Sequence, residues 1–169
     1  VDLLLVRGDN AGRPFVHDDG SVSMGYQTDK DGRIVRDLNR SYSIATALTG
    51  AEVFAAMYYL TGQDRYREVA CRASDWLLDT MTLDGRFPNY SYQGEEWEPK
   101  RRTAAFERPN QIAAYVAEGL VAAWTYIDDE AFRSRLTRRI VPHIEWLLRK
   151  QNDDGSWAAN GSPDQWRSH

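Results

Sequence analysis

The chain contains a single cysteine, Cys71, so the sequence offers no disulfide framework for its 169 residues. A chain of this length can bury an adequate core without disulfides, and one thiol therefore says little about the compartment. Because Cys71 falls among apolar neighbours in an expected helix, we expect a buried structural thiol and not a nucleophile. The three histidines show no ligand spacing, so the sequence predicts no metal site.

Long hydrophobic runs and a strong charge of one sign are also missing. No stretch approaches the roughly 20 apolar residues of a membrane-spanning helix, so no membrane partner is expected. The net charge of −4 and the pI of about 5.4 disfavour nucleic acid as a main partner. No glycine-rich phosphate loop, nucleophile elbow or dinucleotide fingerprint occurs, and we expect no cofactor.

The most informative feature is a segment that occurs twice, seventy residues apart. Residues 75–78 (Asp-Trp-Leu-Leu) match residues 145–148 (Glu-Trp-Leu-Leu), and Asp-Gly pairs follow at 84–85 and 154–155. Residues 18–22 (Asp-Asp-Gly-Ser-Val) echo the later pair and are interpreted as a third, degenerate copy. Glycine adopts a positive φ at no steric cost, so the chain can reverse at each pair. We therefore interpret the chain as a tandem repeat.

Hydrophobic periodicity predicts two helical hairpins. The first joins a helix over 41–60 to one over 64–81, and the second joins a helix over 110–127 to one over 129–150. The short links require each pair to be antiparallel. The predicted apolar stripes are Ile44, Leu48, Ala51, Ala55 and Tyr58; Tyr66, Ala70, Ala73 and Leu77; Ile112, Val116, Leu120, Ala123 and Ile127; and Phe132, Leu136, Ile140 and Leu147.

Four residues mark the expected ends and irregularities of these helices. Ser41 is the expected N-cap of the first helix, and Gly62 its C′ residue. Asp129 lies in an acidic run that caps the start of the last helix. Pro142 removes a backbone donor inside that helix, so we expect a kink or a broken start there.

These elements predict an all-α fold of tandem antiparallel helical hairpins, an α/α toroid or solenoid with long loops on one rim. Residues 1–169 form one repeat domain, with approximate repeats at 1–40 (partial), 41–109 and 110–169. Residues 23–40 are expected to be loop-like. A full toroid needs about a dozen helices, so we expect an incomplete fragment whose partners include the remaining repeats of a longer chain.

The long loop over 82–109 is where we expect chemistry, because loops on a rigid scaffold tend to carry binding residues. Its aromatic rings can stack on sugar rings, and two carboxylates can divide acid and base roles across a glycosidic bond. The expected partner is a carbohydrate substrate. The expected catalytic residues are Glu95, Glu96 and Asp84, and the expected substrate-binding residues are Tyr90, Tyr92, Trp97, Arg108, Asn110, Asp154 and Trp157.

Several of these residues also have a purely structural interpretation. Asp84 and Asp154 precede glycine and can serve the turn alone. Phe87 and Trp157 can be wedges beneath the helix ends instead of platforms for substrate. The polar residues that open the helix at 110 can form caps and salt bridges instead of binding a uronate carboxylate.

Residues 55–66 (Ala-Ala-Met-Tyr-Tyr-Leu-Thr-Gly-Gln-Asp-Arg-Tyr), 76–78 (Trp-Leu-Leu) and 84–87 (Asp-Gly-Arg-Phe) carry a resemblance to a known group. The chain over about 41–157 resembles the six-hairpin α/α-toroid enzymes that act on carbohydrates, including unsaturated-glucuronyl hydrolases, polysaccharide lyases and related epimerases. The resemblance implies a glycoside hydrolase or polysaccharide lyase, or a lobe of one, acting on an oligo- or polysaccharide. No catalytic motif of the family maps onto these residues.

A second resemblance rests on residues 146–157, where Trp-Leu is followed by Gln151 and then by Gly-Ser-Trp. This spacing is similar to the Gln–Trp repeats of squalene-type terpenoid cyclases, and it implies that Gln151 caps a helix end and stacks on Trp157. The upstream basic-then-small pair is missing, and the earlier copy has Met81 in place of glutamine. A terpenoid cyclase- or prenyltransferase-like lobe and a non-catalytic helical-repeat binding module are therefore the alternative functions.

Overall fold

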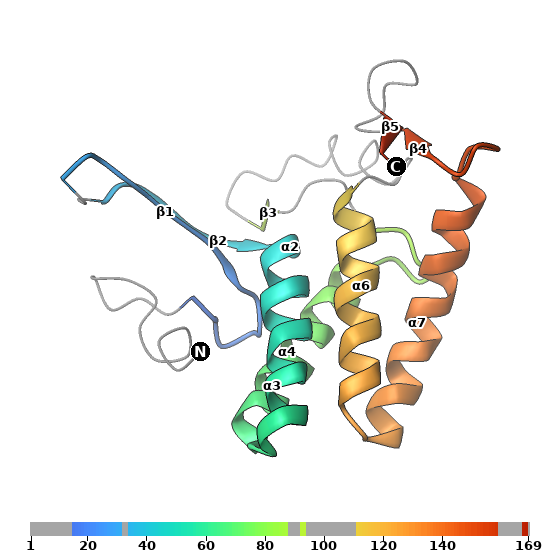
Figure 1. Ribbon diagram of the computed structural model, residues 1–169, viewed down its shortest axis with the longest axis horizontal. Helices are drawn as coiled ribbons and strands as arrows, with labels where there is room; N and C mark the ends of the chain where they lie inside the picture. Colours follow the sequence, from blue (N-terminus) through green and yellow to red (C-terminus); the bar gives the residue numbers. More distant parts are fainter. Residues whose placement is uncertain (1–14, 32–33, 88–91, 94–110, 159–166, 169) are drawn as a thin grey trace.

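The structure, a computed structural model, describes residues 15–31, 34–87, 92–93, 111–158 and 167–168. Its body consists of two antiparallel helical hairpins that stand side by side (Figure 1). The first hairpin contains a continuous helical segment, α2 (Ser43–Ala45), η1 (Thr46–Val53) and α3 (Phe54–Thr61), followed by α4 (Asp64–Thr80). The second contains α6 (Gln111–Tyr126) and α7 (Glu130–Arg149). The predicted fold class of tandem helical hairpins is confirmed.

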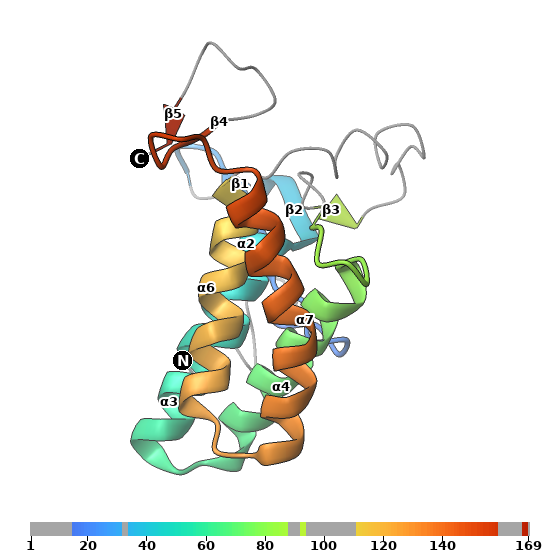
Figure 2. The same ribbon diagram turned by 90° about the vertical axis from the view of Figure 1, so that its right-hand side faces the viewer.

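The helices form two layers. One layer holds the first helix of each hairpin, with α6 packed along η1, and the other holds α4 and α7 (Figure 2). Gly119 allows a close approach in the first layer, because a Cβ atom there would lie only 2.5 Å from the carbonyl oxygen of Ala47. The two backbones therefore meet directly at this point, which only glycine allows.

Burial follows the predicted stripes in three of the four helices. Every predicted stripe residue of α4, α6 and α7 is buried, together with Ile127 directly after α6. The first helix differs: Leu48 and Tyr58 are half-exposed, whereas Ala47 and Phe54 are fully buried. Residues 46–53 form a π-helix, so the 3.6-residue period behind the prediction does not apply there. Cys71, expected to be buried, is half-buried.

The helix ends agree with the sequence in part. Gly62 ends α3 with a φ of 68°, and the Asp129 carboxylate accepts the amide of Phe132 at 2.8 Å as the N-cap of α7. Ser41 is not an N-cap, because the preceding strand runs through it and the helix begins at Ser43. The broken start expected at Pro142 is also wrong, since α7 continues through this residue.

The segment expected to be loop-like forms strands instead. Strands β1 (Ser23–Thr28) and β2 (Ile34–Tyr42) pair antiparallel, and β3 (Tyr92–Gln93) adds to the end of β2 beside α2. The polar sequence of β2 has no hydrophobic alternation, which is why periodicity missed it. A second small sheet joins β4 (Trp157–Ala158) to β5 (Arg167–Ser168). In the described part of the chain, no helix has the length and apolar character needed to cross a membrane.

Three turns share one hydrogen-bonding pattern, which confirms that residues 18–22 repeat the later cassettes. We call residues 17–21, 82–86 and 152–156 the first, second and third turns. In each, the first amide donates to the carbonyl four residues on, at 2.8, 2.9 and 2.8 Å. The glycine amide donates back to the first residue at 2.9, 3.0 and 2.9 Å, and the glycine φ values are 89°, 83° and 83°.

The first two turns dock directly onto helix backbones. A Cβ atom on Gly20 would lie 2.3 Å from the carbonyl carbon of Arg72 in α4. A Cβ atom on Gly85 would lie 2.3 Å from the amide nitrogen of His143 in α7. Glycine is needed at both positions for two reasons, the positive φ and the missing space for a methyl group.

Candidate functional site

The connections that carry the predicted site leave one end of the helical bundle. The small sheets β2–β3 and β4–β5 lie at the end where α6 begins and α7 finishes (Figures 1 and 2). Six of the ten predicted site residues, Tyr90, Glu95, Glu96, Trp97, Arg108 and Asn110, lie outside the described residues. For Tyr92 and Trp157 the structure places the backbone, in β3 and β4.

Asp84 is exposed, and its carboxylate is engaged within the second turn. It accepts the hydroxyl of Thr82 at 2.6 Å and the Nε of Arg86 at 3.1 Å. The hydrogen bond from Thr82, with the help of Arg86, holds the pKa of this carboxyl below its usual range. Asp84 is thus an ionised turn residue, and its catalytic role stays a prediction.

Asp154 has a similar position in the third turn. Its carboxylate accepts the amide of Ser156 at 3.0 Å and the hydroxyl of Ser156 at 2.6 Å. Asp19 holds Ser21 in the same way in the first turn, at 2.9 and 2.7 Å. Gln151 bridges the third turn, because its side-chain amide donates to the carbonyl of Gly155 at 2.6 Å.

Phe87 follows the second turn and is fully buried, so its side chain is a wedge in the core. It meets the ring of His143 edge-on, with the ring centroids 6.4 Å apart. His143 is itself fully buried, and its two ring nitrogens lie 2.5 Å from the carbonyl oxygen of Gly85 and 2.9 Å from that of Ala113. Burial lowers the pKa of His143, against the pull of these two carbonyls. The imidazole therefore connects the second turn and α7 to the N-terminal end of α6.

The structure adds a pair of carboxyl groups that the sequence prediction did not include. Glu52 on η1 and Glu118 on α6 lie close enough to interact electrostatically. Partial burial, and then the charge of Glu118, raise the pKa of Glu52 above its ordinary value. The direct backbone contact at Gly119, next to Glu118, brings the two helices this close. Two neighbouring carboxyl groups in different environments are the arrangement from which acid and base roles can be divided.

The surroundings of this pair are exposed and partly aromatic. Tyr115 lies one helical turn before Glu118 and is 36% exposed. Val53, directly after Glu52, is 41% exposed, and Val121, one helical turn after Glu118, is 44% exposed. A ring and apolar groups next to paired carboxyls can offer a surface to a sugar ring while the acids contact its hydroxyls.

A signal for this pair is present in the sequence. Glu52 is the only charged residue between Arg40 and Asp64, and Glu118 is the only one between Arg108 and Asp128. Each is a lone charged residue in an otherwise uncharged helix, a pattern that can be recognised without the structure.

Taken together, the stacked antiparallel hairpins and the connections at one end define part of an α/α toroid. The structure is similar to unsaturated glucuronyl hydrolase from Bacillus sp. GL1, described as responsible for the degradation of glycosaminoglycan, with a TM-score of 0.60 and 19% identity. A structure of a UGL variant with the saccharide dGlcA-Glc-Rha-Glc gives the same values.

This similarity covers 83% of the present chain but 38% of each neighbour, so the chain spans well under half of their length. No protein-family model and no curated protein sequence matches the chain. The resemblance to α/α-toroid carbohydrate-active enzymes is therefore supported at the level of the fold.

Proposed function

We propose that the chain is a carbohydrate-active enzyme of the α/α-toroid type, or a lobe of one, that cleaves glycosidic bonds of an oligo- or polysaccharide as a hydrolase or a lyase. The observation that carries this proposal is the similarity to unsaturated glucuronyl hydrolase over 83% of the chain. Because that neighbour is described as acting in glycosaminoglycan degradation, acidic saccharides are the first substrates to test.

Glu52 is the proposed proton donor, because its raised pKa favours the protonated form. Glu118 is the proposed second carboxylate, and Tyr115 supplies a ring against which a sugar can pack. The loop residues Glu95 and Glu96 are the competing catalytic candidates, supported by the mixture of aromatic and acidic residues around them. Both pairs belong to the same proposed function, and one experiment distinguishes them.

The experiment compares the wild-type chain with Glu52→Gln, Glu118→Gln, Glu95→Gln and Glu96→Gln variants on glycosaminoglycan oligosaccharides. New reducing ends without the ultraviolet absorbance of an unsaturated uronate report hydrolysis, and new reducing ends together with that absorbance report lyase chemistry. Loss of a general acid or base is expected to lower kcat by roughly 100-fold or more in one pair. Glu68→Gln is the matched control, because Glu68 is an exposed glutamate on α4.

If each of the four single variants keeps the wild-type activity, neither the Glu52–Glu118 pair nor the Glu95–Glu96 pair is catalytic. Saccharide binding without turnover would instead favour the non-catalytic binding module. Circular dichroism of each variant ensures that a lost activity is not a lost fold.

A further inference from the structure

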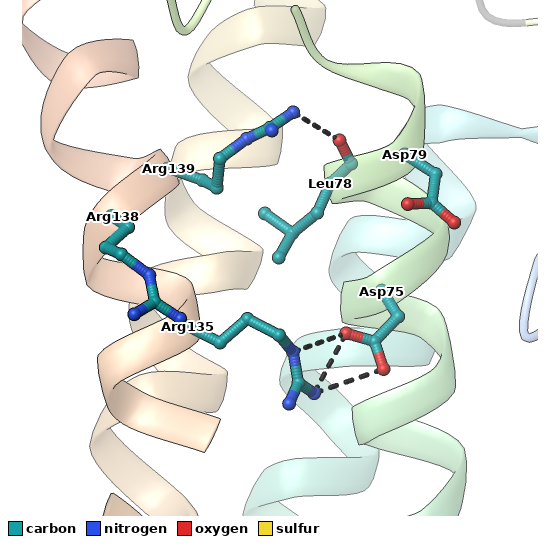
Figure 3. A pocket seen from close by; sticks show the side chains of 6 residues that line it. All are labelled: Asp75, Leu78, Asp79, Arg135, Arg138 and Arg139. Carbon is teal, nitrogen blue, oxygen red and sulfur yellow. Dashed lines mark hydrogen bonds and ion pairs between the residues drawn. The ribbon is translucent and has the colours of Figure 1, made fainter. Parts of the chain in front are cut away.

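The helices α4 and α7 are equivalent, with Trp76 and Trp146 at the same position seventy residues apart. One face of α4 is covered by α7. There Arg135 forms a two-pronged contact with the Asp75 carboxylate at 2.9 and 3.1 Å, and Arg139 donates to the carbonyl of Leu78 at 2.8 Å (Figure 3). Arg139 also donates to the carbonyl of Met81 at 2.6 Å. Two arginines four residues apart thus fasten α7 to the C-terminal end of α4.

Within this contact Leu78 is only 6% exposed, whereas Asp75 is partly exposed and Asp79 is exposed. The groove along the contact has a volume of about 630 Å³ and is lined by polar and charged groups besides Leu78 (Figure 3). The helices α4 and α7 are therefore held together by ionic and hydrogen-bonding contacts that surround the apolar side chain of Leu78.

The corresponding face of α7 has no helix on it among the described residues. Leu148, the equivalent of Leu78, is 57% exposed, and Val141 is 48% exposed. Ile144 lies between them in a one-turn spacing and is partly exposed, so the three form an apolar stripe. Glu145 takes the place of Asp75, and within the described part of the chain its ion pair is a 3.8 Å contact with Arg149 of its own helix. An acidic group again lies beside an apolar stripe at the end of a helix.

The third turn shows the same difference from the first two. Gly20 and Gly85 are buried against Arg72 in α4 and against Pro142 and His143 in α7, which are equivalent positions of the two helices. Gly155 has the same φ of 83° as Gly85 but is exposed. The nearest atom that a Cβ there would meet is Nε2 of Gln151 at 3.9 Å.

We propose that the face of α7 formed by Val141, Ile144, Glu145 and Leu148, together with the third turn, is a docking surface for a further helix of this repeat. Its occupant is an amphipathic helix that carries two arginines four residues apart. One arginine pairs with Glu145, as Arg135 pairs with Asp75, and the other donates to carbonyl oxygens at the end of α7, as Arg139 does at the end of α4. The backbone of this helix lies against Gly155, as α7 lies against Gly85.

In the test, the full chain is titrated into a fluorescently labelled synthetic peptide with the sequence of residues 129–150. This peptide contains Arg135 and Arg139, the two arginines that contact α4 in the structure. Fluorescence anisotropy is expected to show saturable binding. Leu148→Asp is expected to abolish it, and Glu145→Lys to weaken it at least tenfold. Leu60→Asp is the matched control, because Leu60 is another exposed leucine, at the far end of α3, and it should leave binding unchanged.

A charge exchange makes the assignment specific. A peptide with glutamate at both arginine positions should fail to bind the wild-type chain and should bind the Glu145→Lys variant better. If Asp75→Lys weakens peptide binding and Glu145→Lys does not, the peptide displaces α7 from α4, and the proposal is overturned. Absence of binding at millimolar concentration would also overturn it.

Sedimentation of the chain alone tests whether a second copy of the chain occupies this face instead. A dimer that Leu148→Asp dissociates would show that a second copy occupies the face, and the further-helix proposal would then be wrong. A chain that stays monomeric, together with peptide binding that depends on Leu148 and Glu145, supports it. Thermal unfolding of each variant confirms that these exposed substitutions leave the fold intact.

Discussion

Replacing Gly85 by alanine tests the docking of the second turn more sharply than any other single change. The new methyl group would lie 2.3 Å from the backbone of Pro142 and His143, in a helix that cannot rotate aside as a side chain can. Two penalties therefore add. A positive φ costs an L-residue roughly 1–2 kcal/mol, and overpacking a rigid contact costs about 1–3 kcal/mol more. We expect Gly85→Ala to lower the free energy of unfolding by roughly 2–5 kcal/mol.

Gly155→Ala is the matched control, because Gly155 has the same φ in the same type of turn but open space around it. We expect it to show the backbone penalty alone, about 1–2 kcal/mol. Urea unfolding of both variants, followed by circular dichroism, gives the two free energies. Equal destabilisation by the two substitutions would refute the claim that the second turn is held by direct backbone contact with α7.

The remaining predictions concern His143 and the Asp75–Arg135 pair. Because burial lowers the pKa of His143, the unfolded chain takes up a proton at a higher pH than the folded chain. Stability should therefore fall as the pH drops below about 6.5, the ordinary pKa of histidine, and urea midpoints of a His143→Asn variant should vary less over that range. Asp75 and Arg135 are partly exposed, at 47% and 43% of their side chains. A double-mutant cycle with Asp75→Asn and Arg135→Met should thus give a coupling of about 0.2–1 kcal/mol, and a coupling of several kcal/mol would contradict this solvent-screened view.

The sequence predicted three of the four helices with their buried faces, because each combines a strict 3.6-residue stripe with clear ends. The first helix was placed correctly but its buried face was not. Its π-helical turns, and the contact of Ala47 with Gly119 of a helix some seventy residues later, override the local pattern. The strands β1 and β2 mix a few apolar residues with many polar ones, and no sustained period-two alternation runs through both strands.

The candidate site was less predictable than the fold. The Asp-Gly pairs drew attention to Asp84 and Asp154, whose carboxylates the structure shows engaged within their own turns. Glu52 and Glu118 stand out as lone charges in the sequence, but their pairing depends on how closely η1 and α6 approach each other. That approach rests on a missing side chain at Gly119, which one-dimensional periodicity does not record.

The joint between a turn and the neighbouring helix involves main-chain atoms on both sides, so it does not specify which side chains surround it. Alanine occupies the contacted position in α4 and histidine the same position in α7, yet both turns dock alike. A polypeptide assembled through such joints can exchange most of its residues and still keep its shape. A similar fold at only 19% sequence identity, as found with unsaturated glucuronyl hydrolase, is an outcome that this kind of joint permits.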